Sequence, residues 1–287
     1  MIVAKKGKGN SGLNKIKIHT QKIVIYIVLC MIAALAVIYV VFGFEIFKIE
    51  DIDLIKAVKD QAISANVLLI QVTEESGSGD TTVTSTSYSA GHSGVVFKKE
   101  DNRYYVLTAL HAIDLKYPKI LVLRYDQPTY NAYVTDNDFV GLSVYYEQFP
   151  EAVIEYYDEE YDLAVVSFVS ECEFTVLPIA PEPSEYNEPV VAIGNPHENA
   201  RNAITTGRIT SRKPVPFGDE AGKNQHNVIT HSAKISVGSS GGALLNKNME
   251  IIGINLGGSE NKFRFIEGKA MPCDKILEFL RGTNIVL

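Results

Sequence analysis

Cysteine is scarce in this chain of 287 residues, which contains only Cys30, Cys172 and Cys273. The three stand far apart, without a Cys-x-x-Cys pair and without histidines at the spacing of zinc ligands. The sequence therefore predicts no metal and no cofactor. For Cys172 and Cys273 the alternatives are a single disulfide between them or two free buried thiols, and we favour free thiols.

Basic residues are absent from a long central stretch. No lysine or arginine occurs between Tyr125 and Ala200, which holds 16 acidic residues. The first 22 residues carry six lysines and no acid, so the other 265 residues have 21 basic and 34 acidic groups, a net charge of −13. Because phosphate binding needs a basic face, nucleic acid is not an expected partner. We interpret the acidic stretch as solvated strand faces; the alternatives are a basic protein partner or calcium, since residues 136–141 faintly resemble the start of an EF-hand loop.

Charged residues are also absent from residues 23–44, a run that is mostly apolar. A helix of 22 residues is about 33 Å long, close to the thickness of a bilayer core. We predict a basic cytoplasmic tail over 1–22, a transmembrane helix over 23–44 and a juxtamembrane helix or linker over 45–64. Lysines before the span and acids after it predict a single-pass protein of the cell membrane with an extracytoplasmic body. The alternative is a secretory signal cleaved after Ala36.

From residue 65 to residue 287, short β-rich runs alternate with turns, which indicates an all-β sandwich or barrel. Residues 74–91 are rich in Ser, Thr and Gly and predict a loop. A final helix is expected over 273–281, with Gly282 at its C-terminal end. The β-rich runs lie at 67–72, 95–97, 104–109, 120–125, 162–168, 189–194, 203–210, 227–233, 243–246 and 250–256.

Three residues in a fixed order along the chain suggest hydrolysis by a serine nucleophile. His111 follows the run 104–109, Asp162 opens the run 162–168, and Ser240 stands within Gly238-Ser239-Ser240-Gly241-Gly242. Serine-nucleophile hydrolysis needs an attacking hydroxyl, an imidazole base and a carboxylate that orients the imidazole. The glycine-rich segment also fits the nucleophile elbow of α/β-hydrolases, but those enzymes place histidine after serine. No histidine follows His231, so the order favours the chymotrypsin arrangement.

The neighbours of Ser240 are small, which lets the backbone turn sharply. The amides of Gly238 and Ser240 are therefore expected to form an oxyanion hole. Taken singly, each feature has a plainer interpretation: a packing histidine, a solvated aspartate at a strand start, and a Gly/Ser turn. The remaining histidines are interpreted as packing or surface residues; they are His19, His92, His197, His226 and His231.

From about Val67 to Leu280 the chain resembles the Deg/HtrA-type branch of the trypsin-like serine proteases. The matching motifs are HSGVVF (92–97), YVLTALHAI (105–113), DEEYDLAVVSF (158–168), VAIGNP (191–196), TTGRITS (205–211), ISVGSSGGALLN (235–246), IIGIN (251–255) and GKAMP (268–272). The resemblance implies two six-stranded antiparallel β-barrels over 65–287, with His111 as general base, Asp162 as its orienter and Ser240 as nucleophile. It also implies a primary specificity pocket walled by Asn255, Leu256, Gly257, Gly258, Gly268, Lys269 and Ala270.

The chain departs from this branch in three places. Ser239 stands where the branch usually has asparagine, a small change. The sequence stops before a PDZ domain, so peptide sensing by such a domain is not expected. Lys234 stands where the branch has a small apolar residue, and its ammonium either favours an acidic side chain before the cleaved bond or reaches solvent. Relatives are often trimers, which implies a homo-oligomer.

The sequence thus predicts a membrane-anchored, extracytoplasmic serine endopeptidase that acts on polypeptides without a cofactor. The rival hypothesis is a catalytically silent trypsin-like adaptor at the membrane. Such adaptors usually lack one member of the triad, whereas all three residue types are present here.

Overall fold

The computed structural model describes residues 26–33, 51–76, 84–137, 139–197, 201–218, 226–261 and 264–285, and the chain divides into two compact units, Met1–Ile52 and Asp53–Leu287. In the first unit, residues 26–33 are helical. The rest of the predicted tail and span, residues 1–25 and 34–44, lies outside the described residues. Within the described part of the chain, no helix is both long enough and apolar enough to cross a bilayer.

The predicted juxtamembrane segment is helical where it is described. Residues 51–57 are α-helical and continue into a π-helical turn, η1 (Val58–Ala62), and a 3-10 turn, η2 (Ile63–Ala65). Residues 45–50 lie outside the described residues. In the second unit, Leu54 and Val58 are buried in the main hydrophobic core, so this helix packs against the sheets that follow it.

Six strands of the second unit close into an antiparallel barrel. The pairing order is β1-β3-β4-β7-β6-β5, and β5 returns to β1, while β2 adds to β1 outside the ring. The predicted loop over 74–91 is wrong for residues 74–76, which belong to β1, and for residues 84–88, which form β2. Residues 89–91 have no regular structure, and residues 77–83 lie outside the described residues. The bounds are β1 (Asn66–Ser76), β2 (Thr84–Tyr88), β3 (His92–Glu100), β4 (Arg103–Ala109), β5 (Ile120–Leu123), β6 (Glu151–Asp158) and β7 (Leu163–Val169).

Seven further strands form a second antiparallel sheet, in the order β10-β11-β14-β13-β12-β8-β9. An isolated bridge between Ile209 and His231 joins the chain after β9 to β11. Among the described residues these pairings do not show the second closed barrel that the sequence predicts. The bounds are β8 (Pro189–Gly194), β9 (Ala203–Arg208), β10 (Val215–Phe217), β11 (His226–His231), β12 (Ala243–Leu245), β13 (Ile251–Asn261) and β14 (Arg264–Pro272).

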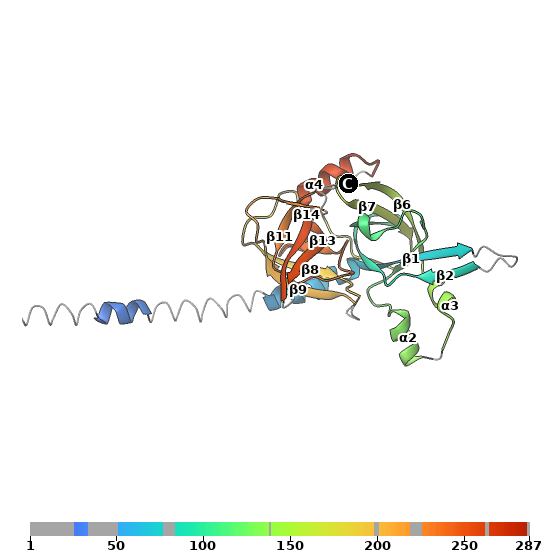
Figure 1. Ribbon diagram of the computed structural model, residues 1–287, viewed down its shortest axis with the longest axis horizontal. Coiled ribbons are helices and arrows are strands. Elements are labelled where there is room, and N and C mark those ends of the chain that lie inside the picture. The colour runs from blue at the N-terminus through green and yellow to red at the C-terminus, as the bar shows by residue number, and fades with distance from the viewer. Residues whose placement is uncertain are drawn as a thin grey trace, which may run out of the picture. The chain divides into compact units, whose positions relative to one another are not determined.

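The C-terminal helix α4 (Cys273–Arg281) matches its predicted bounds and contacts both sheets. It starts directly after β14 and packs against β13, while the Phe279 ring lies 5.2 Å from Tyr156 of β6, measured between ring centroids. Figure 1 shows the two sheets next to each other, with α4 in red above them. The helix therefore holds the second sheet against the barrel.

Two short helices interrupt the β structure, and the sequence did not indicate them. They are α2 (Tyr130–Asp136) and α3 (Leu142–Tyr146), in the connection between β5 and β6. Both extend from the barrel in Figure 1. Neither has a side-chain cap, but their aromatic rings bury one another against the outer face of β1 and β5. The fold is predominantly β, with these helices as an addition to the predicted all-β class.

All three cysteines are free thiols. Cys273 is buried, and burial, the largest effect, raises the pKa of its thiol to about 11. Cys172 is exposed, so the expectation of two buried thiols holds for Cys273 but is wrong for Cys172.

Candidate active site

Two neighbouring strands of the closed barrel bring His111 and Asp162 together. β4 ends at Ala109, and the 3-10 turn η3 (Leu110–Ala112) that follows carries His111. Asp162 directly precedes β7, and Ala109 lies opposite Leu163 in the β4–β7 ladder. In an antiparallel pair the end of one strand lies beside the start of the other. Two residues 51 positions apart in the sequence therefore become neighbours.

The Asp162 carboxylate makes two hydrogen bonds to the same residue. Its Oδ1 accepts the His111 backbone N–H at 2.8 Å, and its Oδ2 lies 2.6 Å from His111 Nδ1. The Asp162 side chain is 13% exposed and that of His111 is 45% exposed. Because a carboxylate only accepts hydrogen bonds, Nδ1 carries a proton and the neutral ring presents Nε2 as an acceptor.

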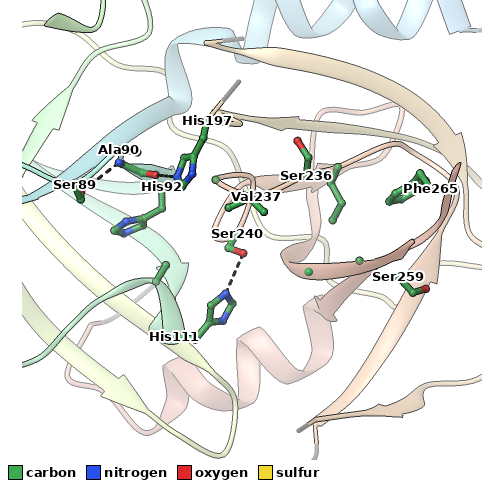
Figure 2. A pocket seen from close by; sticks show the side chains of 16 residues that line it. Ser89, Ala90, His92, His111, His197, Ser236, Val237, Ser240, Ser259 and Phe265 are labelled. Atoms are coloured by element: carbon green, nitrogen blue, oxygen red, sulfur yellow. Dashed lines mark hydrogen bonds between the residues drawn. The ribbon is translucent and has the colours of Figure 1, made fainter. Parts of the chain in front are cut away.

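Ser240 comes from the second sheet, in the loop between β11 and β12. Its Oγ lies 3.0 Å from His111 Nε2, the contact drawn as a dashed line in Figure 2, and 3.3 Å from the carbonyl oxygen of Leu256. This places a hydroxyl within hydrogen-bonding reach of an imidazole that a carboxylate orients, the arrangement that activates a serine nucleophile.

The backbone amides of Gly238 and Ser240 are held in a defined direction. The carbonyl of Val237 accepts the amide of His197 at 2.9 Å, and the carbonyl of Ser239 accepts the amide of Gly242 at 2.9 Å. In a trans peptide the N–H and the C=O point in opposite directions. The Val237 carbonyl therefore sets the direction of the Gly238 N–H, and the Ser239 carbonyl sets that of the Ser240 N–H. Gly238 has φ +94, a conformation that glycine adopts without strain, and an added Cβ would lie 2.6 Å from the Asn195 carbonyl oxygen.

A cleft of about 690 Å³ runs across Ser240. Figure 2 shows Ser89, Ala90, His92 and His197 on one side of Ser240, and Ser236, Ser259 and Phe265 on the other. The described lining residues include no lysine, arginine, aspartate or glutamate. As far as the described residues line it, the cleft is therefore uncharged apart from any histidine that is protonated.

Comparison with known families agrees with this geometry. The family described as the trypsin-like peptidase domain matches residues 92–254, more than half of the chain. The chain belongs to this family.

The chain is also similar to curated serine proteases. It is 28% identical over 218 residues to the serine protease Do-like HtrA of Bacillus subtilis, covering 73% of this chain and 44% of the relative. It is 27% identical over 192 residues to the serine endoprotease DegS of Haemophilus influenzae, covering 66% of this chain and 48% of that protein. The chain thus spans less than half the length of these relatives.

A solved structure has a similar fold. The crystal structure of the Rv3671c protease in its inactive form superposes with a TM-score of 0.53, covering 80% of this chain and 96% of that one. Sequence identity is 18%, so this likeness supports the trypsin-like fold alone.

The residues predicted to wall the specificity pocket occupy several environments. Gly257 and Gly258 line the cleft, and Leu256 lines an adjoining cavity that His111 and Asp162 also border. The other four do not line the cleft. Asn255 and Ala270 are fully buried, Gly268 packs against the His231 ring, and the Lys269 ammonium lies 4.7 Å from the Phe217 ring centroid.

Lys234 does not face the cleft. It is exposed and borders a separate cavity of about 180 Å³, and its carbonyl accepts the Thr205 hydroxyl at 2.8 Å. Ile235, the next residue, lines the cleft in its place.

Sequence reasoning missed three residues beside the site. His92 and His197 line the cleft, although both were interpreted as packing or surface residues. His92 is 6% exposed, and burial, followed by the neighbouring His111 and His197, lowers its pKa to about 3. Ser93 is buried against the Ser240 loop. The motif HSGVVF contains His92 and Ser93 and was the available signal.

No metal site emerges from the described side chains, since no group of three or more His, Cys, Asp or Glu residues among them is arranged to hold an ion. Asp138, in the segment that faintly resembles an EF-hand loop, lies outside the described residues.

Proposed function

We propose that this trypsin-like peptidase is a serine endopeptidase that cleaves peptide bonds through an acyl-enzyme on Ser240. The observation that carries the proposal is the unbroken contact chain from the Asp162 carboxylate to His111 at 2.6 Å and from His111 to Ser240 at 3.0 Å. Its relatives with the names HtrA and DegS are serine proteases, which supports the same chemistry.

In the first half of the reaction, Ser240 Oγ attacks the scissile carbonyl carbon while His111 Nε2 takes the hydroxyl proton. Negative charge develops on the substrate oxygen, where the amides of Gly238 and Ser240 donate hydrogen bonds. Asp162 stabilises the imidazolium that forms. The tetrahedral intermediate then expels the amine, which takes the proton from Nε2, and Ser240 is left as an ester.

In the second half, water replaces the amine product. His111 Nε2 accepts a proton from the water as its oxygen attacks the ester, and the same two amides stabilise the second oxyanion. The proton then returns to Ser240 Oγ as the carboxylic acid product leaves. Every proton is exchanged at Nε2, so the reaction needs no metal or cofactor.

The side chain before the cleaved bond is proposed to be apolar. Gly257, Gly258 and Phe265 line the cleft together with Ile235, and none of them carries a charge. An ammonium-lined pocket would favour Asp or Glu, but Lys234 lies outside this cleft. We therefore expect Val, Ala or Leu to be preferred.

The test is hydrolysis of a peptide library by the purified chain, with Ser240→Ala and Lys234→Ala beside the wild type. Ser240→Ala should abolish cleavage while keeping the fold, and Lys234→Ala should leave the apolar preference unchanged. Peptides that bind without being cut by the wild type would instead support the silent adaptor. A preference for Glu or Asp that vanishes in Lys234→Ala would reverse the proposed specificity.

The second sheet is proposed to be the partner barrel of a trypsin-like pair. Its seven antiparallel strands and the bridge between Ile209 and His231 support this arrangement. The active site then lies where the trypsin-like fold places it, between the two barrels.

We also propose that residues 23–44 anchor the protein in the membrane with the peptidase outside the cytoplasm. The support is the uncharged run and the six lysines before it. A reporter fused after Leu287 should behave as extracytoplasmic, and the mature N-terminus should lie upstream of residue 23. A mature chain that begins near Val37 would instead indicate a cleaved signal and a secreted enzyme.

A further inference from the structure

The loop that carries the proposed oxyanion hole is fixed through four successive carbonyls. The carbonyls of Val237 and Ser239 accept the amides of His197 and Gly242, both at 2.9 Å. The other two are bound by a single residue: Ser93 donates its hydroxyl to the Gly238 carbonyl at 2.7 Å and its amide to the Ser240 carbonyl at 3.1 Å. Ser93 lies on β3, in the barrel that also carries His111.

The proton of the Ser93 hydroxyl has a defined direction. The hydroxyl oxygen accepts a hydrogen bond from the backbone N–H of Asn195 at 2.7 Å, and a backbone N–H can only donate. Its proton is then free for the Gly238 carbonyl, which can only accept. Ser93 is fully buried, and the Thr108 hydroxyl binds its carbonyl at 2.8 Å, so the residue is fixed and shielded from water.

These bonds fix the peptides on both sides of Gly238. His197 holds the carbonyl of Val237, which directs the Gly238 amide, and Ser93 holds the carbonyl of Gly238 itself. Within the loop, Ser239 donates its amide to the Ser236 carbonyl at 2.9 Å, and its hydroxyl accepts the Ser236 amide at 3.3 Å. All of these groups are uncharged, so the loop conformation depends on hydroxyl and amide contacts that do not titrate.

We propose that Ser93 is a positioning residue, whose hydroxyl keeps the amides of Gly238 and Ser240 aligned before a substrate binds. The inference rests on the proposed function, since alignment matters only if a peptide oxyanion occupies this place. It predicts a loss in the rate of the chemical step rather than in substrate binding. Removing one oxyanion donor from a serine protease costs roughly 100- to 1,000-fold in kcat, so misaligning these amides should cost about 10- to 100-fold.

The test compares Ser93→Ala with Ser167→Ala in the full chain. Ser167 is a matched control, because it is also fully buried and its hydroxyl also has two partners, Arg103 and Glu155, but it does not line the cleft. We measure kcat, KM, the inhibition constant of a peptide boronic acid, and the melting temperature. A boronic acid bound to Ser240 places an oxygen where the oxyanion forms, so its affinity reports on the alignment.

Both variants should lower the melting temperature, because Ser93→Ala leaves the buried backbone N–H of Asn195 without its acceptor, and Ser167→Ala removes a buried hydroxyl that bridges Arg103 and Glu155. Only Ser93→Ala should lower kcat by about 10- to 100-fold, with KM within about twofold and boronic acid affinity reduced in parallel with kcat. A kcat no lower than that of Ser167→Ala, measured where both variants are folded, would overturn the inference. If Ser93→Ala does not fold, Ser93→Cys keeps a weaker donor: reduced kcat at constant KM supports the proposal, and wild-type kcat overturns it.

Failure of the proposed function has a separate signature. A wild-type chain that hydrolyses no peptide, or a Ser240→Ala variant that still does, removes the endopeptidase proposal itself. An active wild type with an equally active, folded Ser93→Ala variant removes only the role of Ser93.

Discussion

At the scale of single residues, the site depends on a few side chains whose hydrogen-bonding options are limited. Asp162 uses both carboxylate oxygens on His111, one for the backbone and one for the ring. This double contact sets the position of the imidazole and its tautomer together. Asp162 itself has φ +50, a backbone conformation that aspartate tolerates better than most residues, so the identity of this residue matters for both shape and chemistry.

Asp162→Asn tests this dependence. The asparagine oxygen can still accept one His111 N–H, but its amide group would face a ring nitrogen that has to carry a proton. The ring is then driven to the tautomer with its proton on Nε2, which cannot accept a proton from Ser240. We expect kcat to fall by about 10⁴-fold, as at the equivalent substitution in other serine proteases, with an unchanged circular dichroism spectrum. A loss below about tenfold would show that Asp162 does not set the tautomer.

At the scale of elements, the closed barrel supplies His111 and Asp162 through one strand pair, while a loop of the second sheet supplies Ser240. The α2–α3 connection lies outside this arrangement, and its aromatic cluster borders neither the cleft nor the cavity beside it. Tyr145 is at the centre of the cluster, 2% exposed and in ring contact with Tyr130, Tyr133, Tyr146 and Phe149. The connection should therefore be separable from catalysis.

Tyr145→Ala is expected to loosen residues 128–149 without altering peptide hydrolysis. Removing a buried aromatic ring costs about 3–5 kcal/mol, and this short connection has few other contacts to offset the loss. Hydrogen exchange followed by mass spectrometry should show faster exchange over this stretch. Tyr145→Phe is the matched control, because it keeps the ring and removes only the hydroxyl bond to the Pro128 carbonyl. A comparable loss of kcat in Tyr145→Ala would instead link the connection to the site.

Strands with continuous apolar runs, such as β7 and β8, were predictable from the sequence because both of their faces are covered. β6 was missed because Glu151 and Glu155 on its exposed face interrupt the apolar run that includes its inward residues Ala152 and Ile154. α2 and α3 are short, make no side-chain cap hydrogen bond and depend on tertiary ring contacts. The order and setting of His111, Asp162 and Ser240 were sufficient to predict them together as one site. The direction of the Lys234 side chain was not predictable, because it depends on local backbone geometry.

At the scale of the whole molecule, two buried histidines connect stability to pH. Burial lowers the pKa of His231 to about 4, against a smaller opposing effect of its bond to Asn255, and lowers that of His92 to about 3. In the unfolded chain both have pKa values near 6.5. As pH falls below about 6.5, the unfolded chain takes up protons that the folded chain does not, so stability decreases down to about pH 4 for His231 and about pH 3 for His92.

We expect the free energy of unfolding to fall by about 2 kcal/mol per histidine between pH 7.5 and pH 5. Urea unfolding of the wild type and of His231→Gln at both pH values measures the effect. The variant should be less stable at pH 7.5 but should lose about 2 kcal/mol less than the wild type on going to pH 5. An equal loss in both proteins would mean that His231 is protonated as readily in the folded state as in the unfolded state.

The proposed catalysis depends on Ser240 being a nucleophile activated by His111 within a formed oxyanion hole. A fluorophosphonate probe measures this directly, because it phosphonylates a serine only when the base and the hole act together. Tandem mass spectrometry of the labelled, purified chain should locate one adduct, on Ser240, with none in Ser240→Ala and labelling strongly reduced in His111→Ala. A folded wild-type chain that stays unlabelled, or that carries its adduct on another residue, would contradict the account.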